Sequence, residues 1–155
     1  MRELMFYTDG AYSSKTQMGG WAMVCLEDNK IINEQTGYEP YTTGNRMEFT
    51  ALLTVLEYVN SLQTEDTTVE IFTDSAYVSN TFNLGWFRTW LNNGWKTADR
   101  QDVKNQDILR RVVALYIKLK QKYNLQITKV KGHKDNKWNV YVDHLAVKAR
   151  KELEF

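Results

Sequence analysis

The chain has 155 residues, of which 43% are hydrophobic and 25% charged, a composition that fits one globular domain and leaves no room for a second. No apolar run approaches the roughly 20 residues that a membrane helix needs, and residues 1–4 lack the apolar stretch of a signal peptide. We therefore expect residues 1–155 to form one cytoplasmic domain without membrane contact. Cys25 is the single cysteine, which excludes an internal disulfide and indicates a reduced thiol in the core.

Charge is distributed unevenly along the chain, although its net value is only +1. Residues 1–74 contain four lysines and arginines against twelve acids, whereas residues 104–137 contain ten lysines and arginines against two acids. This segregation fits an acidic site that collects cations beside a basic face that binds phosphates. A basic helix that is simply solvated would explain the second region equally well.

The first third of the chain predicts three strands. Residues 4–7 are rich in β-formers, and the run stops at an Asp-Gly pair. Residues 21–26 and 31–32 predict two further strands on either side of a turn at residues 27–30. Because sequential strands joined by short turns pair antiparallel, we expect a three-strand meander.

The middle of the chain predicts a helix and a buried strand. Apolar residues recur at helical spacing between residues 45 and 60. Residues 69–72 predict a short strand that ends at Asp74, and Ser75 is placed to cap the helix that follows. The apolar stripe of the first helix consists of Phe49, Leu52, Leu53, Leu56 and Val59.

The remainder of the chain predicts helices around one strand. Residues 84–104 hold three tryptophans among glycines and asparagines, which indicates a short helix and an exposed, projecting loop. Residues 103–122 predict a helix, 125–130 a strand and 138–153 a closing helix. The expected core stripe of that last helix is Val142, Leu145, Ala149 and Leu153. Strands interleaved with helices after a meander predict an α/β fold in which a mixed sheet carries helices on its faces.

Acidic residues stand at positions where a fold rarely places them. Two predicted strands end at Asp9 and Asp74, and parallel neighbours about 4.8 Å apart would bring both to the carboxyl edge of the sheet, where α/β folds place their sites. Glu48 shares a helical stripe with apolar residues and so faces the core. Asp143 lies early in the last helix, beside its apolar stripe. Like charges this close require a counter-ion.

Each acid taken alone is better explained as a strand-end turn former or a helix-cap residue. The four together favour a metal site instead. Carboxylate ligands suit Mg²⁺ or Mn²⁺, whereas Zn²⁺ would need more nitrogen and sulfur ligands than two histidines and one cysteine supply. The pattern therefore indicates divalent-metal and phosphate chemistry.

A series of motifs spans almost the whole chain: Tyr7-Thr8-Asp9-Gly10, Gly19-Gly20-Trp21-Ala22, Thr42-Thr43-Gly44-Asn45-Arg46-Met47-Glu48, Thr73-Asp74-Ser75-Ala76-Tyr77-Val78, Gly94-Trp95-Lys96-Thr97-Ala98-Asp99, Val103-Lys104-Asn105, Val130-Lys131-Gly132-His133 and Asn139 to Ala146. In this order and spacing they resemble type 1 ribonuclease H of the bacterial kind, which carries a basic protrusion. A lone Thr-Asp-Gly would be a weak signal, but the complete series is specific.

The resemblance implies a ribonuclease H-like fold, a five-stranded mixed sheet flanked by helices in which strands 1–3 form the antiparallel meander and strands 4 and 5 run parallel to strand 1. It implies that Asp9, Glu48, Asp74 and Asp143 bind the metal and carry catalysis, and that a loop carries His133 as a further catalytic residue. The implied activity is endonucleolytic hydrolysis of the RNA strand of RNA–DNA hybrids, with 5′-phosphate and 3′-hydroxyl products.

The chemistry agrees with that implication. In a two-metal site, with ions about 4 Å apart, one ion activates a water for in-line attack and the other stabilises the leaving 3′-oxygen. The expected cofactor is therefore a pair of Mg²⁺ ions, with Mn²⁺ as an alternative. His133 follows a glycine in a basic stretch, and the resemblance assigns it proton transfer near the leaving group.

The expected partner is an RNA–DNA hybrid, which must be recognised through the 2′-hydroxyl and through groove shape. Thr43, Gly44 and Asn45 resemble the family's contacts to the minor groove and to a DNA phosphate. Residues 84–104 resemble the projecting substrate-binding segment, in which Trp86 is the expected stacking residue. Further expected substrate contacts are Lys15, Arg88, Lys96 and Asn139, while Trp90 and Trp95 are expected to pack.

Three departures from the family's pattern concern binding. Residues 13–18 replace a Gly/Pro-rich stretch, so that Lys15 is expected to meet a phosphate by its charge. Ala76 replaces an amide side chain, and residues 91–93 replace a cationic cluster. Hybrid affinity and its salt dependence are therefore expected to differ, whereas the four acids are untouched.

Two other functions remain open at this stage. The fold would also suit another polynucleotidyl transferase of the superfamily, such as an integrase, a junction resolvase or a proofreading exonuclease, although the exonucleases usually begin with two acids on the first strand. A non-catalytic hybrid-binding module would be expected to have lost at least one acid. With no separate hybrid-binding domain, a monomer is expected.

Overall fold

The computed structural model describes residues 1–132 and 135–152. Its elements follow in the order β1 (Arg2–Ser13), β2 (Met18–Glu27), β3 (Lys30–Pro40), α1 (Gly44–Ser61), β4 (Thr67–Thr73), α2 (Ala76–Asn83), α3 (Trp86–Asn93), α4 (Gln106–Lys122), β5 (Asn124–Lys129) and α5 (Lys137–Lys151). None of the helices in these ranges is both long enough and apolar enough to cross a membrane.

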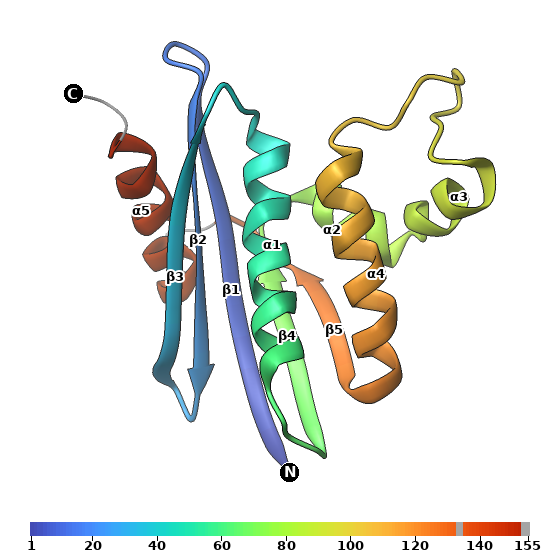
Figure 1. Ribbon diagram of the computed structural model, residues 1–155. Coiled ribbons are helices and arrows are strands. Elements are labelled where there is room, and N and C mark those ends of the chain that lie inside the picture. Colours follow the sequence, from blue (N-terminus) through green and yellow to red (C-terminus); the bar gives the residue numbers. More distant parts are fainter. Residues whose placement is uncertain (133–134, 153–155) are drawn as a thin grey trace.

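One mixed sheet runs through the molecule in the strand order β3-β2-β1-β4-β5 (Figure 1). β1 pairs antiparallel with β2, and β2 pairs antiparallel with β3, which is the predicted meander. β4 runs parallel to β1, and β5 runs parallel to β4. The five-stranded sheet expected from the resemblance is confirmed.

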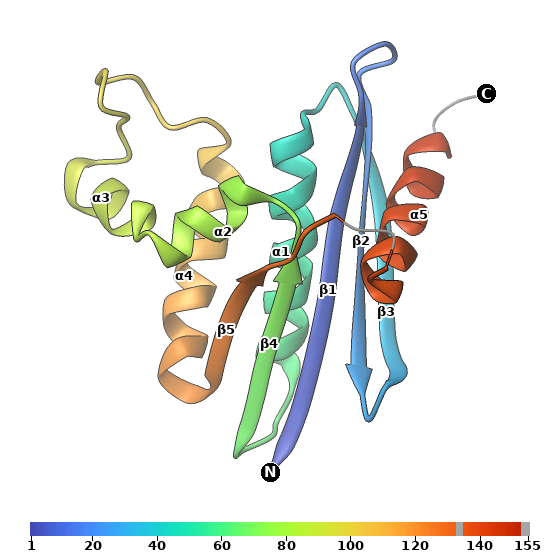
Figure 2. The same cartoon turned by 180° about the vertical axis from the view of Figure 1, so that it is seen from behind.

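Helices cover the two faces of the sheet unequally. α1 and α4 pack together on one face, and α5 lies on the other face over β2, β1 and the edge strand β3 (Figures 1 and 2). The larger core joins α1, α4 and the protrusion to the sheet, whereas a smaller core lies under α5 around Tyr7, Val142 and Ala146. β1 contributes to both cores, because its side chains alternate between the two faces.

The meander strands are longer than their sequence pattern indicated. β1 does not stop at the Asp-Gly pair but continues to Ser13, and β3 extends to Pro40, because both keep pairing with β2 to its far end. The turn between β2 and β3 consists of Asp28 and Asn29, which both adopt positive φ, as a tight two-residue hairpin turn requires.

Two helices also differ from their expected limits. α4 begins at Gln106 rather than at residue 103, because the Val103 N–H bonds back to the Trp95 carbonyl and Asn105 adopts a left-handed conformation before the helix. In α5, Ala146 takes the core position expected for Leu145, which is only partly buried. Leu153, the last residue of the expected stripe, lies outside the described residues.

The remaining packing expectations are confirmed. Trp90 and Trp95 are buried and stack with ring centroids 5.8 Å apart inside the protrusion. Ser75 caps α2 by accepting the Val78 N–H at 3.1 Å. Cys25 is fully buried, and burial raises the pKa of its thiol to about 12, so that it stays protonated and inert.

Candidate active site

Asp9 and Asp74 lie together because β1 and β4 are parallel neighbours. The last paired residues of these strands are Tyr7 and Phe72, and each aspartate follows two residues later. Asp9 is only 4% exposed. Asp74 directly follows the end of β4, as predicted, whereas the buried Asp9 lies inside β1 rather than at its end, because β1 keeps pairing with β2 beyond it.

Glu48 reaches the same place from α1, and Gly10 permits its approach. A Cβ at Gly10 would lie 2.6 Å from the Glu48 nitrogen and 2.8 Å from the Met47 carbonyl carbon, so no other residue fits without moving the helix. The Gly10 N–H donates to Asp9 Oδ1 at 2.9 Å and to Glu48 Oε1 at 3.0 Å. One backbone amide therefore orients two carboxylates.

Three of the four predicted acids form one group. Asp9, Glu48 and Asp74 can each offer an oxygen within 4.8 Å of the others. Glu48 Oε2 is buried and has no hydrogen-bond partner in the described part of the chain. Asp143 is exposed on α5 and stands at the margin of this group, close enough to raise the pKa of Asp9. The site is therefore a trio of carboxylates, in which Asp9 is buried and Glu48 and Asp74 are partly buried, with an exposed fourth acid beside it.

The electrostatics of the trio show that it lacks positive charge. Burial raises the pKa of Asp9 and, together with the neighbouring charges of Glu48 and Asp74, brings it to about 10. Burial likewise raises the pKa of Glu48 to about 7 and shifts that of Asp74 upward. Without a cation the trio must therefore hold protons that ordinary carboxyls release in neutral solution.

The carboxylate oxygens of the trio fit a divalent metal ion as ligands. Carboxylate oxygens are the ligands that hard cations prefer, and the trio brings three of them within coordination range of a shared point. The unpartnered Glu48 Oε2 supplies a buried acceptor that no donor of the described protein satisfies. A bound cation would neutralise the repulsion that raises these pKa values.

The expected catalytic histidine, His133, lies outside the described residues. The residue before it is described, and a Cβ built on Gly132 would lie 3.4 Å from Asp74 Oδ2. The Val130 N–H donates to the Thr73 carbonyl at 2.8 Å, which continues the pairing of β5 with β4 beyond its last strand residue. The segment leading to His133 therefore runs beside the carboxylate trio.

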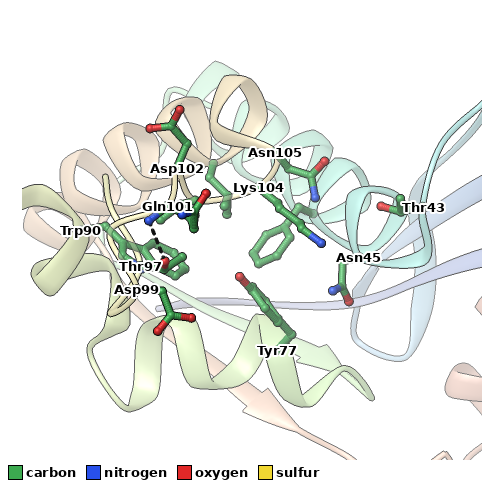
Figure 3. A pocket seen from close by; sticks show the side chains of 13 residues that line it. Thr43, Asn45, Tyr77, Trp90, Thr97, Asp99, Gln101, Asp102, Lys104 and Asn105 are labelled. Carbon is green, nitrogen blue, oxygen red and sulfur yellow. Dashed lines mark hydrogen bonds between the residues drawn. The ribbon is translucent and has the colours of Figure 1, made fainter. Parts of the chain in front are cut away.

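A groove of about 710 Å³ is lined in part by residues that lie close to the trio along the chain, and Figure 3 shows its lining side chains. Asn45 and Phe49, which line it, flank Glu48 in α1, and Tyr77 follows Asp74 at the start of α2. The Lys104 side chain extends across the groove toward Asn45 (Figure 3). The groove is lined by Thr43, Asn45, Phe49, Tyr77, Trp90, Thr97, Asp99, Gln101, Asp102, Val103, Lys104, Asn105 and Leu109.

The structure brings some predicted substrate residues to this groove and adds others. Thr43 and Asn45 line it, and Gly44 lies between them as the first residue of α1. Tyr77 and Lys104 were not singled out by sequence reasoning, although both belong to motifs of the series. Asp102 carried no sequence signal, because its place in the groove depends on a loop conformation.

Two predicted contacts of the protrusion lie outside the groove lining. Trp86 is partly buried and packs edge-on against Tyr77, with ring centroids 5.5 Å apart. The Arg88 guanidinium is exposed and lies 5.0 Å from the centroid of the Phe87 ring. Both side chains therefore belong to α3, beside the groove rather than within it.

The three other predicted contacts are spread over the molecule. Lys15 is exposed in the loop between β1 and β2. Lys96 forms an ion pair with Asp102 in the protrusion. Asn139 is only 6% exposed in the first turn of α5, where its N–H donates to the Asn136 side chain.

Basic side chains of α4 make contacts within the chain. Arg111 lies 3.5 Å from a Glu57 carboxylate oxygen, and the Lys120 ammonium donates to the Leu125 carbonyl at 3.0 Å. The Arg110 guanidinium lies over the Trp95 ring. Part of the charge in residues 104–137 therefore serves internal packing.

Comparison with known proteins places the chain in a family. The sequence model of the RNase H family matches residues 1–151. Ribonuclease H of Chlorobaculum parvum is 41% identical to this chain over 151 residues, which cover 97% of each protein.

Solved structures share the fold. LC9-RNase H1, described as a type 1 RNase H with the type 2 active-site motif, has a TM-score of 0.80 at 22% identity and covers 98% of this chain and 74% of that one. LC11-RNase H1, solved in complex with RNA/DNA hybrid, has a TM-score of 0.70 at 18% identity and covers 96% of this chain and 97% of that one. At such identities these structures bear on the fold alone, whereas the sequence matches decide the family. The chain is therefore an enzyme of the ribonuclease H family.

Proposed function

We propose that this protein is an endonuclease that hydrolyses the RNA strand of RNA–DNA hybrids with Mg²⁺ as its cofactor, leaving 5′-phosphate and 3′-hydroxyl ends. The carboxylate trio carries the proposal, because its buried and partly buried acids can hold divalent metal and are otherwise costly to the fold. Family membership and the fold shared with a hybrid-bound ribonuclease H support the choice of substrate.

The residues of the trio would hold the metal in this reaction. When bound, a pair of divalent ions would supply an activated water and stabilise the leaving 3′-oxygen. Asp9, Glu48 and Asp74 provide the ligands, and the Gly10 amide fixes two of them before substrate arrives. Asp143, exposed at the margin, is proposed to complete the ligand set on the solvent side.

The groove beside the trio is proposed to take the hybrid. Thr43 and Asn45 stand where a strand passing from the groove to the trio would meet them. Thr43 is committed to the helix, since its hydroxyl accepts the Arg46 N–H at 3.2 Å, so its contact is expected to be weaker than that of Asn45. Gly44 is proposed to contact the hybrid beside them, and Lys15 in the β1–β2 loop and Asn139 in α5 are proposed as further contacts.

The protrusion is proposed to contact the DNA strand. Trp86 offers a partly exposed ring on α3 for stacking, and Arg88 and Lys96 are exposed cations of the same segment. These contacts would lie on the far side of the groove from α1.

His133 is proposed to relay a proton near the leaving group. The path of Gly132 beside Asp74 supports this, because it brings the chain to the trio one residue earlier. We further propose that residues 1–155 act as one cytoplasmic, monomeric domain.

The decisive experiment compares substrates and metals. A labelled RNA–DNA hybrid, duplex RNA, duplex DNA and single-stranded RNA would be incubated with Mg²⁺, Mn²⁺ or EDTA, with the Asp9→Asn variant as the inactive control. We expect cleavage of the hybrid RNA at internal positions, none in EDTA, and products whose 5′ ends carry phosphate.

Other outcomes would redirect the assignment. Stepwise release of mononucleotides would favour a proofreading exonuclease, and cutting of duplex DNA would favour an integrase or a resolvase. Tight hybrid binding without cleavage in either metal would favour a binding module, although the chain retains all four acids.

A further inference from the structure

Residues 95–103 form a small hairpin at the outer wall of the groove. The Val103 N–H donates to the Trp95 carbonyl at 3.0 Å, and the Thr97 N–H donates to the Gln101 carbonyl at 2.8 Å. Between these two bonds, Lys96 and Asp102 stand opposite each other as an antiparallel bridge. The hairpin therefore holds the two residues as a cross-strand pair.

The Lys96 ammonium donates to Asp102 Oδ1. The backbone of Lys96 is fixed as well, because its N–H donates to Asn93 Oδ1 at 3.0 Å and its carbonyl accepts the Asn93 amide at 2.9 Å. The ammonium lowers the pKa of Asp102, so that this acid is charged in neutral solution. The pair is therefore built into the hairpin by contacts on both strands.

Asp102 belongs to the groove lining, together with Asp99 and Lys104 (Figure 3). Two acids and one lysine give this lining a formal charge of −1, counted over the lining residues. A negative wall opposes the binding of a polyanion. Asp102 nevertheless lies beside Lys96 of the protrusion, and its effect is to occupy the ammonium of that lysine.

We propose that Asp102 restrains Lys96 in the free protein and so limits how strongly the protrusion binds the phosphates of an RNA–DNA hybrid. The inference rests on the proposed function and adds a determinant of substrate affinity to it. Asp102 acts through Lys96 and is a positioning residue, not a catalytic one.

Because the Lys96–Asp102 pair is exposed, a phosphate of the hybrid can replace Asp102 as the partner of Lys96. The Lys96 and Asp102 side chains are 46% and 73% exposed, and surface ion pairs of this kind contribute little and are screened by salt. A phosphate can therefore compete with Asp102 for the lysine. Each such exchange gains one contact and loses another, so that Lys96 adds little net affinity while Asp102 is present.

The test measures hybrid binding by the Asp102→Asn variant. Affinity for a short fluorescent RNA–DNA hybrid would be titrated at several salt concentrations, with all proteins carrying Asp9→Asn to prevent cleavage. We expect Asp102→Asn to bind roughly two- to fivefold more tightly at low salt, the range of a surface charge contact. The plot of log affinity against log salt should steepen by about 0.9, because one more phosphate is neutralised.

A matched charge control separates this from a general charge effect. Asp28 lies in the β2–β3 turn, far along the sheet from the groove, and Asn is compatible with its positive φ. Asp28→Asn removes the same charge and should leave the salt slope unchanged. Equal effects of the two substitutions would overturn the proposal.

A double-mutant cycle tests the role of the lysine. Lys96→Gln should hardly change hybrid affinity when Asp102 is present, and should abolish the gain when Asp102 is Asn. If the gain persists in the double variant, Asp102 acts by direct repulsion and the restraint of Lys96 is refuted. Absence of hybrid binding by all four proteins would instead refute the proposed function, so the two failures are distinguishable.

Discussion

The carboxylate trio and the neighbouring groove differ in whether their acidic side chains have basic partners within the protein. In the trio, one buried and two partly buried acids lie together, two of them accept from a single backbone amide, and one oxygen has no hydrogen-bond partner among the described residues. Around the groove, two acids form ion pairs with basic side chains. Asp102 pairs with Lys96, and the Arg46 guanidinium donates to Asp107 in two bonds of 2.9 and 2.8 Å.

The difference shows which charges the fold has balanced by itself. An ion pair whose two partners both belong to the protein contributes to stability or holds a side chain in one orientation. A buried acid without a cation costs stability, and the chain retains it because a ligand supplies the missing charge. The following substitutions test that distinction.

The largest effect is expected for catalysis when the trio is broken. Asp9→Asn should lower the rate of hybrid cleavage by more than about 100-fold, since even the outer partners of metal ligands are typically worth 10- to 100-fold. Asp143→Asn should lose less, because Asp143 is exposed and stands outside the trio. Rates measured over a range of Mg²⁺ concentrations would check the order, and a greater loss for Asp143→Asn would contradict it.

The close approach of α1 to β1 predicts the next effect. Gly10→Ala places a methyl group 2.6 Å from backbone, which should destabilise the protein by about 3 kcal/mol, the upper end of overpacking costs. Gly44→Ala serves as the stability control, since its Cβ would meet its nearest neighbour only at 3.8 Å. Urea unfolding of both variants measures the difference, and equal midpoints would show that α1 adjusts freely.

The missing counter-charge predicts an unusual pH dependence. The folded-state pKa values of Asp9, about 10, and Glu48, about 7, exceed their ordinary values of 3.8 and 4.5, so the folded chain binds protons more tightly than the unfolded chain. The metal-free protein should therefore lose stability as pH rises from about 5 toward about 9. Asp9→Asn should remove part of this slope and stabilise the metal-free protein by about 1 to 3 kcal/mol at the alkaline end.

Urea unfolding in EDTA across this pH range measures the slope. Saturating Mg²⁺ should flatten it in the unsubstituted protein, because binding to the folded state alone adds about 2.7 kcal/mol at 100 times the dissociation constant. Metal-free stability that is constant or rises with pH would mean that the trio is already neutralised by the protein.

The smallest effect is expected where the chain has paired its own charges. Arg46 also binds Glu39 at 2.8 Å, so it ties β3 and α4 to the start of α1. Arg46→Met should cost about 1 kcal/mol or less, because the Asp107 side chain is 66% exposed. Arg46→Lys keeps the charge but loses the bidentate hydrogen bonding, so its stability should lie between those of the unsubstituted protein and Arg46→Met.

The pH dependence of this pair has the opposite sign. Arg46 holds the pKa of Asp107 at about 2, below its ordinary value of 3.8, so the pair contributes fully above that value and is lost as pH falls through about 2. Thermal unfolding in acid should therefore distinguish Arg46→Met from the unsubstituted protein less at about pH 2 than at about pH 6. A constant difference would assign the effect to packing of the arginine stem.

Much of the fold follows from local sequence patterns. The helix period that includes Phe49 and the cap at Ser75 depend on neighbours within a few residues, and both appear where expected. The length of β3 was missed, because its residues gain strand structure from pairing with β2 rather than from their own preference. The start of α4 was missed for a related reason, since a bond from Val103 to Trp95 holds the preceding residues in the hairpin.

By itself the sequence determined the alternation of strands and helices, the motif series of the family, the acid directly after β4 and the acid at one core-facing helix position. Only the tertiary structure decided that Asp9, Glu48 and Asp74 meet while Asp143 stays exposed, and that Asp102 pairs with Lys96. Local patterns depend on contacts within a turn or a strand. The distance between side chains that are remote along the chain depends on strand register and helix approach, which are fixed when the whole sheet and its helices pack.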